Sequence, residues 1–209
     1  MKKYGHIILG CGASGLSLAH HLSNAGFPGG TVLLIDKEDK IINDHTWGYW
    51  SRGPQPFDSI AKLSFKKIGT NSPGQQIVFD LKQYQYHVIQ SIDFYAFVKT
   101  NLAQFKEVNW LKADIESVKE EKDQVIVKTS NGSFQADYVF NSMYNEQDIF
   151  EQSRIFIRQH IKGWVIKTPT LSFNPESMTL FDFNTPQHGH MRYISVIPES
   201  EYRATVKFN

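Results

Sequence analysis

The residues best suited to chemistry lie near the start of the chain. Three glycines in a G-x-G-x-x-G pattern, Gly10, Gly12 and Gly15, follow a short apolar run and open an amphipathic stretch. The first glycine allows a tight strand-to-helix turn, the second lets a pyrophosphate approach the backbone, and the third lets the helix pack closely on the strand. Ala13 and Ser14 lie inside the same turn and are therefore candidate cofactor-binding residues as well.

A carboxylate follows this turn at an informative distance. A second buried strand, residues 31–35, ends in Asp36, which comes 36 − 15 = 21 residues after the last glycine. A carboxylate there can accept hydrogen bonds from the ribose hydroxyls of an adenosine, and it disfavours a 2′-phosphate. FAD or NAD is thus favoured over NADP, and the position of the pattern close to Met1 favours FAD. Lys37 completes the candidate cofactor-binding set, and the alternative is a doubly wound domain with an empty turn.

Composition excludes several classes of protein. The chain has 209 residues, 41% of them hydrophobic and 21% charged, which is enough for one large domain or two interleaved ones. The net charge of +1 comes without a basic cluster, so we expect no nucleic-acid partner. No apolar run is long enough to span a bilayer, and no signal peptide is evident, so the cytoplasm is the expected compartment. The single cysteine, Cys11, excludes an internal disulfide and any cysteine zinc site.

Two further groups of side chains could form sites. Trp47 and Trp50 lie in an aromatic-rich stretch that either fills space under the cofactor domain or lines a pocket for an extended π-system. Trp164, on a later amphipathic strand, is assigned to the same substrate pocket. His188 and His190 have no third ligand near them, so we predict a polar turn and no metal site.

The order of elements predicts an α/β fold. Strands are expected near residues 60–68, 75–81, 108–111, 115–118 and 125–129, with a hairpin at Asn131-Gly132, a return strand at 136–142, and a helix ending near Phe105 that Asp93 caps. The strands between 108 and 129 are expected to form a small inserted sheet. Residues 178–183 and 193–198 are expected to pair as antiparallel strands. The cofactor-binding domain is predicted to comprise residues 1–50 and 84–150, and an incomplete substrate-domain sheet residues 51–83 and 151–209.

These residues resemble the lycopene cyclases of carotenoid biosynthesis, a branch of the FAD-dependent proteins related to aromatic-ring hydroxylases and geranylgeranyl reductases. Five stretches carry the likeness: 7–19, 34–37, 43–47, 159–164, and 179–183 running on to 197–198. The first two are shared by many flavoproteins, and the other three look specific to the cyclases. The resemblance implies a Rossmann-like FAD/NAD(P)-binding domain with an inserted antiparallel substrate sheet, as in aromatic hydroxylases.

The resemblance also implies an activity that is redox-neutral overall. Reduced FAD, with NAD(P)H as its reductant, would assist acid-catalysed closure of a lycopene end group into a β-ionone ring. Protonating an alkene makes a carbocation, so the site needs a protonated acid, a way to stabilise positive charge and a dry pocket. Asp182 matches the family's aspartate and is the candidate catalytic residue, and its alternative role is a strand-end carboxylate bonded to its own turn. Lycopene is dissolved in membranes, so peripheral membrane association is expected.

The sequence departs from the family at its end. The family places a glutamate, regarded as its essential acid, where this chain has Lys207. A lysine facing the same pocket would oppose a carbocation, and the family continues well beyond this point. We therefore expect a fragment or truncated form that does not turn over lycopene unaided. The alternatives are a redox flavoprotein of the hydroxylase or reductase kind, and a nucleotide-binding remnant without turnover.

Overall fold

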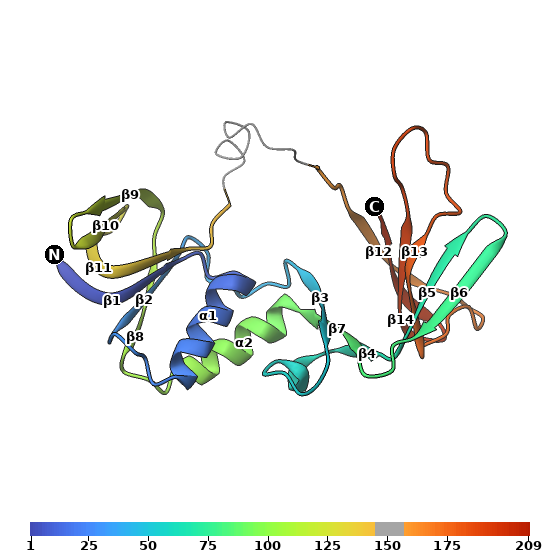
Figure 1. The fold of residues 1–209 in the computed structure, drawn as a ribbon, viewed down its shortest axis with the longest axis horizontal. Helices are drawn as coiled ribbons and strands as arrows, with labels where there is room; N and C mark the ends of the chain where they lie inside the picture. Colours follow the sequence, from blue (N-terminus) through green and yellow to red (C-terminus); the bar gives the residue numbers. More distant parts are fainter. Residues whose placement is uncertain (145–156) are drawn as a thin grey trace. The chain divides into compact units, whose positions relative to one another are not determined.

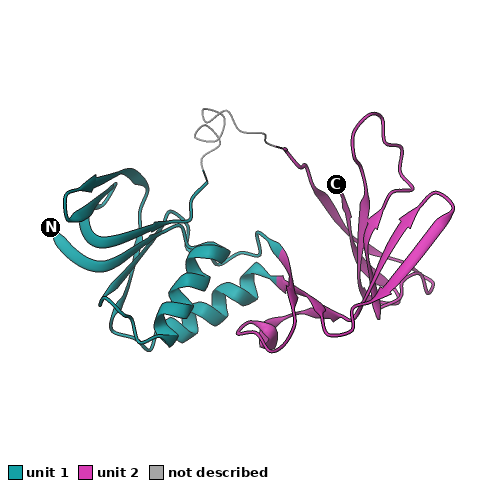
Figure 2. Ribbon diagram, viewed as in Figure 1, with its two compact units in different colours: residues 1–46, 90–154 teal, residues 47–89, 155–209 magenta. Residues whose placement is uncertain are grey.

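The structure, a computed structural model, describes residues 1–144 and 157–209 and divides into two compact units. Unit 1 comprises residues 1–46 and 90–154, and unit 2 comprises residues 47–89 and 155–209 (Figure 2). The structure thus places the first two boundaries at 46 and 90 rather than at 50 and 84. The expected boundary between 150 and 151 lies outside the described residues.

Unit 1 is a six-stranded sheet with two helices, in the strand order β8-β2-β1-β11-β10-β9 (Figure 1). Its elements are β1 (Lys2–Leu9), α1 (Ala13–Asn24), β2 (Val32–Asp36), α2 (Ser91–Leu102), β8 (Val108–Lys112), β9 (Ile115–Glu121), β10 (Gln124–Thr129) and β11 (Gly132–Asn141). The strands β8, β2, β1 and β11 run parallel, whereas β9 and β10 are antiparallel to their neighbours. The predicted α/β architecture and the predicted return strand are confirmed.

The prediction of a separate inserted sheet between residues 108 and 129 is wrong. β8 pairs with β2 in parallel, and β9 and β10 extend the same sheet through the long strand β11. The physical reason lies in β11, whose first half pairs with β10 and which pairs with β1 along most of its length. Tyr4, Leu33, Val127 and Ala136 from these strands share one buried apolar cluster, so a single core supports all six strands.

The two helices pack on each other and cover buried strands. β1 and β2 are near-continuous apolar runs, as expected of strands that are buried on both faces. α2 buries Phe94, Val98 and Leu102 at helical spacing. The helix begins at Ser91 with Gln90 as its N-cap, so the expectation that Asp93 caps it is wrong, since Asp93 lies inside the first turn. Ser91 instead binds the preceding segment, donating from Oγ to Asp44 Oδ1 over 2.7 Å.

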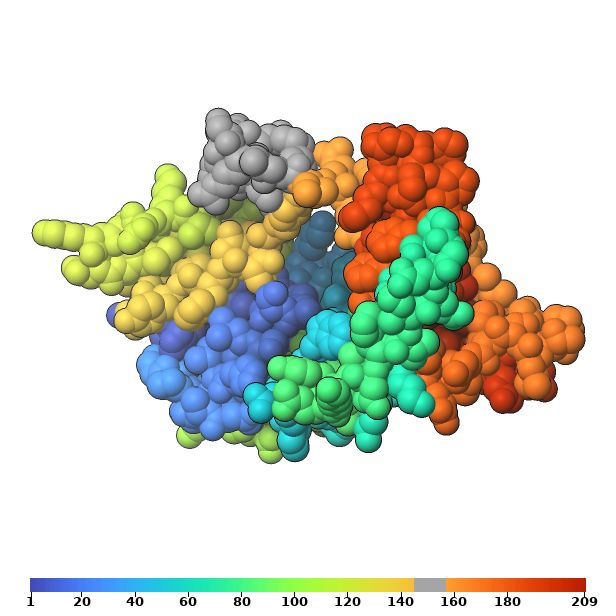
Figure 3. Space-filling view, turned by 45° about the vertical axis from the view of Figure 1, so that its right-hand side comes forward, coloured from blue at the N-terminus to red at the C-terminus, as the bar shows by residue number. Residues whose placement is uncertain are grey.

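Unit 2 consists of two sheets. The larger has the order β12-β15-β14-β13-β5-β6 and the smaller the order β3-β7-β4. Their elements are β3 (Thr46–Ser51), the 3-10 helix η1 (Asp58–Ile60), β4 (Leu63–Phe65), β5 (Lys67–Ser72), β6 (Gln75–Asp80), β7 (Gln85–Gln90), β12 (Lys162–Lys167), β13 (Ser177–Asp182), β14 (Ile194–Ser200) and β15 (Arg203–Phe208). The predicted antiparallel pair β13–β14 is confirmed. The hairpin β5–β6 lies beside β13, far from it in sequence (Figure 3).

The core of unit 2 joins its two sheets. Phe65 and Val88 of the smaller sheet pack with Met178 and Ile197 of the larger one. One face of the larger sheet is therefore partly covered. In residues 1–144 and 157–209, none of the helices has the length and apolar character needed to cross a membrane.

Candidate functional site

The glycine turn has the geometry that its sequence predicts. Gly10 adopts a positive φ of 88°, which glycine accommodates without strain. A Cβ on Gly15 would lie 2.0 Å from the Gly10 carbonyl oxygen, so only glycine lets α1 approach β1 this closely. Ser142, directly after β11, donates from Oγ to the carbonyl oxygens of Leu9 and Gly10 over 2.9 and 2.8 Å. The return strand thus fixes the turn from its other side.

Gly12 differs from Gly10 and Gly15 because it faces open space. A Cβ there would meet no atom within 4 Å. Gly12 is the N-cap of α1, no side chain caps the helix, and its first turn contains no acidic residue. The amides of Ala13 and Ser14 belong to this first turn, where backbone N–H groups have no partner within the helix. Backbone donors and the helix dipole at an uncrowded N-terminus fit a pyrophosphate.

Asp36 ends β2 beside this turn and is already hydrogen-bonded. Its Oδ2 accepts the amide of Cys11 over 2.6 Å, and its Oδ1 accepts the amide of Glu38 over 2.8 Å. The Lys40 ammonium lies 3.5 Å from Oδ2, and both side chains are about seven-eighths buried. These contacts fix the carboxylate in place, which suits it to accept hydrogen bonds from the hydroxyl groups of a ribose.

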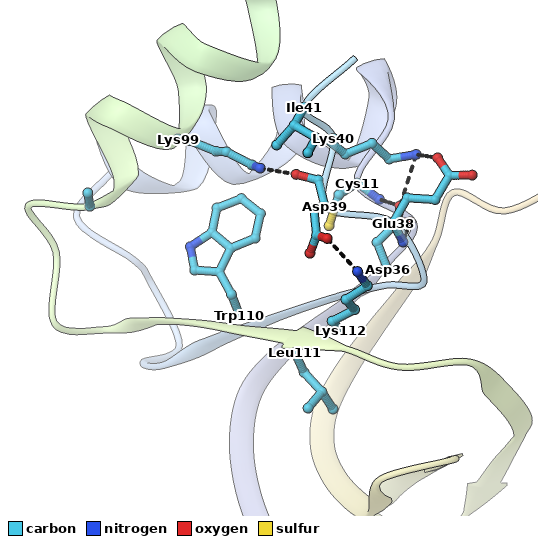
Figure 4. A pocket seen from close by; sticks show the side chains of 11 residues that line it. Cys11, Asp36, Glu38, Asp39, Lys40, Ile41, Lys99, Trp110, Leu111 and Lys112 are labelled. Atoms are coloured by element: carbon cyan, nitrogen blue, oxygen red, sulfur yellow. Dashed lines mark hydrogen bonds and ion pairs between the residues drawn. The ribbon is translucent and has the colours of Figure 1, made fainter. Parts of the chain in front are cut away.

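A cavity of about 400 Å³ opens at Asp36 (Figure 4). The indole of Trp110 stands up from β8 into it, with Lys99 Nζ 5.8 Å from the ring centroid. Asp39 joins the two sides of the cavity, because Lys99 donates to its carbonyl oxygen and Lys112 pairs with its carboxylate. A flat ring beside a ribose-binding carboxylate is suited to stack on a purine, so the cavity fits the adenosine half of a dinucleotide.

Sequence reasoning missed most of the residues that line this cavity, and it included Lys37, which does not line it. Lys40, Lys99, Trp110 and Lys112 line the cavity, whereas Lys37 is exposed and does not. A signal for two of them exists, since β8 is the parallel neighbour of β2 and places Lys112 opposite Asp36 and Trp110 opposite Leu34. Recognising residues 108–112 as the third parallel strand, rather than as part of an inserted sheet, would have found them.

The thiol of Cys11 lies in the same cavity and is expected to be inert. Burial, and then the neighbouring Asp36 carboxylate, raise the pKa of Cys11 to about 12. Only the thiolate is nucleophilic, so we expect no alkylation of native protein by iodoacetamide near neutral pH and rapid alkylation after unfolding in urea. Mass spectrometry of the two samples measures the difference. Rapid labelling of the folded chain would contradict the buried position of the thiol.

Asp182 lies at the end of β13 in a network of donors. Its Oδ2 accepts from Asn71 Nδ2 over 2.9 Å, and its Oδ1 accepts from the backbone amide and Nδ2 of Asn184 over 2.9 and 3.0 Å. Partial burial opposes ionisation, but these hydrogen bonds outweigh it and hold the pKa of Asp182 below its ordinary value. Asp182 is therefore bonded to its own turn and ionised, which suits it to stabilise positive charge rather than to donate a proton.

Strand register places Asp182 and Trp164 on one face of the larger sheet. Asp182 pairs with Ile194, and Ile194 with Phe208, so these side chains share a face. In the next row, Val196 pairs with Val206, and Val206 with Trp164. We call this surface the apolar face: Trp164, Ile166, Ile194, Val196, Val206 and Phe208, with Asp182 at the β13 side and Lys162, which pairs with Phe208, at the β12 side. From β12 to β13 it spans about 14 Å.

Lys207 projects from the opposite face, so the expectation that it adds charge beside Asp182 is wrong. It pairs with Ser195 and Gly163 and alternates with Phe208 along β15. Phe181, Phe183 and Tyr193 stack on one another and alternate with Asp182 and Ile194, so they share the Lys207 face. Burial lowers the pKa of Lys207 from its ordinary value.

The remaining tryptophans lie in the smaller sheet. Trp47 and Trp50 belong to β3, and Trp50 is half-exposed with its ring edge-on to Tyr86 at 5.0 Å. A Cβ on Gly48 would lie 1.9 Å from Tyr86 Oη, so this glycine makes room for Tyr86. The structure thus pairs Trp50 with Tyr86 and places Trp164 in the other sheet, and a shared pocket for the three tryptophans stays a prediction. Among the described residues, no cluster of three metal-ligating side chains occurs.

The family model described as lycopene cyclase protein matches residues 6–207. The chain belongs to the lycopene cyclase family. The match covers both units, the glycine turn, Asp36 and Asp182, as the resemblance predicts. Comparison with curated proteins gives no match.

Several solved structures of other proteins share the fold of this member of the lycopene cyclase family. A flavoprotein/dehydrogenase from Cytophaga hutchinsonii is 13% identical with a TM-score of 0.70, covering 99% of this chain and 55% of that one. PqsL, a probable FAD-dependent monooxygenase from Pseudomonas aeruginosa, is 14% identical with a TM-score of 0.70, covering 99% and 60%. The halogenase PltM, solved with phloroglucinol and FAD, is 13% identical with a TM-score of 0.62, covering 98% and 51%. The Rossmann-like flavoprotein fold of aromatic-hydroxylase type is confirmed, and this chain spans little more than half the length of these structures.

Proposed function

We propose that the chain acts in carotenoid biosynthesis as a lycopene β-cyclase-type flavoprotein, closing a lycopene end group into a β-ionone ring without net oxidation or reduction. The expectation that it does not turn over lycopene unaided rested partly on Lys207, which projects from the face opposite Asp182. The observation that carries this proposal is Asp182, an ionised carboxylate at one side of the apolar face. A hydrocarbon end group can lie on aliphatic and aromatic side chains such as Val206 and Phe208. The carboxylate beside it supplies the negative charge that a carbocation needs.

The cofactor in this proposal is reduced FAD, with NAD(P)H as the source of its electrons. The turn at Gly12 would hold the pyrophosphate, Asp36 the ribose, and Trp110 the adenine. When bound, reduced FAD would assist ring closure without being consumed. Lys37 stays in the proposed set as an exposed residue directly after Asp36.

Ring closure needs positive charge to form and then to disappear. Protonation of the terminal alkene of lycopene, by a general acid other than Asp182, creates a tertiary cation. Attack by the neighbouring double bond closes the ring, and loss of a proton leaves the β-ionone alkene. The Asp182 carboxylate, fixed by Asn71 and Asn184, would stabilise the cation without reorganising at the moment of reaction. Its carboxylate oxygens could also accept the proton that leaves.

The proposal has two competitors, and the redox balance separates them. The test incubates the chain with lycopene in vesicles, FAD and NAD(P)H without oxygen, and measures both ring products by chromatography and NAD(P)H by absorbance. We expect β-ring product in excess of the NAD(P)H oxidised, because the reductant only primes FAD. One NAD(P)H oxidised per product would identify an oxidoreductase of the reductase kind, and the same ratio in a parallel sample that contains oxygen would identify one of the hydroxylase kind. Bound FAD without any product would identify a nucleotide-binding remnant.

The substrate also sets the expected location. Lycopene is insoluble in water, so we propose that the protein works on the cytoplasmic side of a membrane as a peripheral protein. The chain takes no nucleic acid in this proposal, because its charge is nearly balanced.

A further inference from the structure

A cavity of unit 2 belongs to none of the sites described above. It measures about 680 Å³ and lies between the segment that precedes β12 and the loop that precedes β14. Its cationic side chains are Arg158 and Arg192, with His160 and His190 beside them, and none of the described residues that line it is an aspartate or glutamate. We call it the arginine cavity. Its charge is complementary to an anion.

Both walls of the arginine cavity are held by specific hydrogen bonds. On one side, Gln159 Nε2 donates to Tyr193 Oη over 2.7 Å and lies 3.1 Å from Asn209 Oδ1, which fixes the neighbours of Arg158. On the other side, Gln187 Nε2 donates to the Arg192 carbonyl oxygen over 2.8 Å, and its Oε1 accepts the Arg192 amide over 2.9 Å. Arg192 makes no ion pair with any residue in the described part of the chain. Two anchored walls and an unpaired guanidinium make a preformed site.

The rim of the arginine cavity is apolar and exposed. Ile157 is 89% exposed and Met191 is 75% exposed, and both stand next in sequence to an arginine of the cavity. Large apolar side chains that are this exposed and lie next to cations mark an interaction surface. The combination of apolar side chains that enter an acyl layer and arginines that meet its phosphates is the chemistry of an interfacial membrane contact.

We propose that the arginine cavity docks the protein on a membrane containing anionic phospholipid, with Arg158 and Arg192 on the headgroup phosphate and Ile157 and Met191 entering the acyl boundary. This inference assigns a site to the proposed peripheral membrane association, and it therefore rests on the proposed function. Phe208 lines the cavity and also belongs to the apolar face. A hydrocarbon leaving the bilayer at the cavity would therefore reach the face that carries Asp182 without crossing a polar surface.

The experiment measures co-sedimentation with vesicles of phosphatidylcholine alone and of phosphatidylcholine mixed with phosphatidylglycerol, without lycopene or FAD. We expect binding to the mixed vesicles and little to phosphatidylcholine alone. The double variant Arg158→Gln/Arg192→Gln should bind about thirtyfold more weakly, from about a fivefold factor for each cation at an anionic surface. Its matched control, Lys119→Gln/Lys122→Gln, removes two exposed cations of unit 1, one in β9 and one in the turn after it, and should bind as the unaltered chain does.

A second pair of variants tests insertion. Met191→Asp should weaken binding, whereas Leu171→Asp, at a residue 64% exposed elsewhere in unit 2, should not. Circular dichroism checks that all variants are folded. Equal binding to both kinds of vesicle, or unchanged vesicle binding by the double variant, would overturn the proposal. Strong competition with vesicle binding by inorganic phosphate or glycerol phosphate would also overturn it, because the ligand would then be a soluble phosphate. Neither lycopene nor FAD is present in this experiment, so a lack of vesicle binding would not contradict the ring-closure proposal. A lack of ring closure would likewise not contradict vesicle binding.

Discussion

Replacing Gly12 by valine is expected to reduce FAD affinity by about a hundredfold or more, corresponding to roughly 3 kcal/mol of binding free energy. The reason is steric, because the new side chain would fill the open space above the N-terminus of α1 where the pyrophosphate must approach. The folded chain should tolerate the change. No atom lies within 4 Å of the added Cβ, and valine as a poorer N-cap costs only about 1 kcal/mol. Flavin fluorescence titration measures affinity, and urea unfolding measures stability.

The control for this prediction is the glycine three residues later. Gly15→Val places a Cβ 2.0 Å from the Gly10 carbonyl oxygen, a clash with backbone that cannot rotate away. We expect it to lower the free energy of unfolding by about 3 kcal/mol or more. The two variants therefore separate a binding glycine from a packing glycine. Loss of stability in Gly12→Val equal to that in Gly15→Val would refute this distinction.

Replacing Asp182 by asparagine is expected to slow ring closure by about a hundredfold to a thousandfold, as removal of a preorganised charge-stabilising group does. The substitution removes the negative charge while keeping the shape and one acceptor oxygen for the Asn184 amide. Asp80→Asn is the matched control, because Asp80 also ends a strand of unit 2 and accepts the amide two residues later. Product formation by Asp80→Asn should be unchanged. Equal losses in both variants would assign Asp182 a structural role.

Asp182 also predicts a pH dependence that needs no turnover. Its folded pKa lies below its ordinary value, so as pH falls the unfolded chain binds a proton first. The stabilisation is present above about pH 4 and is lost as pH falls through the lowered folded pKa. Asp182→Asn should therefore make the free energy of unfolding less sensitive to acid below about pH 4. Urea titrations at several acidic pH values measure this, and an unchanged acid dependence would show that Asn71 and Asn184 do not favour the ionised form.

The sequence was most informative where function depends on neighbours in the chain. The glycine turn and Asp36 could be predicted because a strand, a tight turn and a helix N-terminus are local, and each glycine has its own steric reason. Lys99 and Trp110 could not be found in this way. They reach the cavity from α2 and β8, after an intervening segment that belongs to unit 2, and only the parallel pairing of β8 with β2 brings them to Asp36.

Asp182 and Lys207 show a second limit. The family pattern places both near one substrate site, but the side on which a strand residue points depends on register. A shift between Thr179 and Asp182 inserts one extra residue in β13, and this sets Asp182 with Ile194 and Phe208. Lys207 then falls on the opposite face. No periodicity in the sequence reveals such a bulge, because it depends on pairing with β14 and β5.

The most direct test of the site at Gly12 and Asp36 is calorimetric titration of the purified chain with FAD, with ADP, and with FMN. FAD and ADP share the adenosine and the pyrophosphate, whereas FMN has neither. We predict that ADP binds and competes with FAD, that FMN does neither, and that Gly12→Val abolishes both ADP and FAD binding. Binding of FMN without competition by ADP would contradict the assignment of the Asp36 cavity to adenosine, and with it the proposed cofactor site.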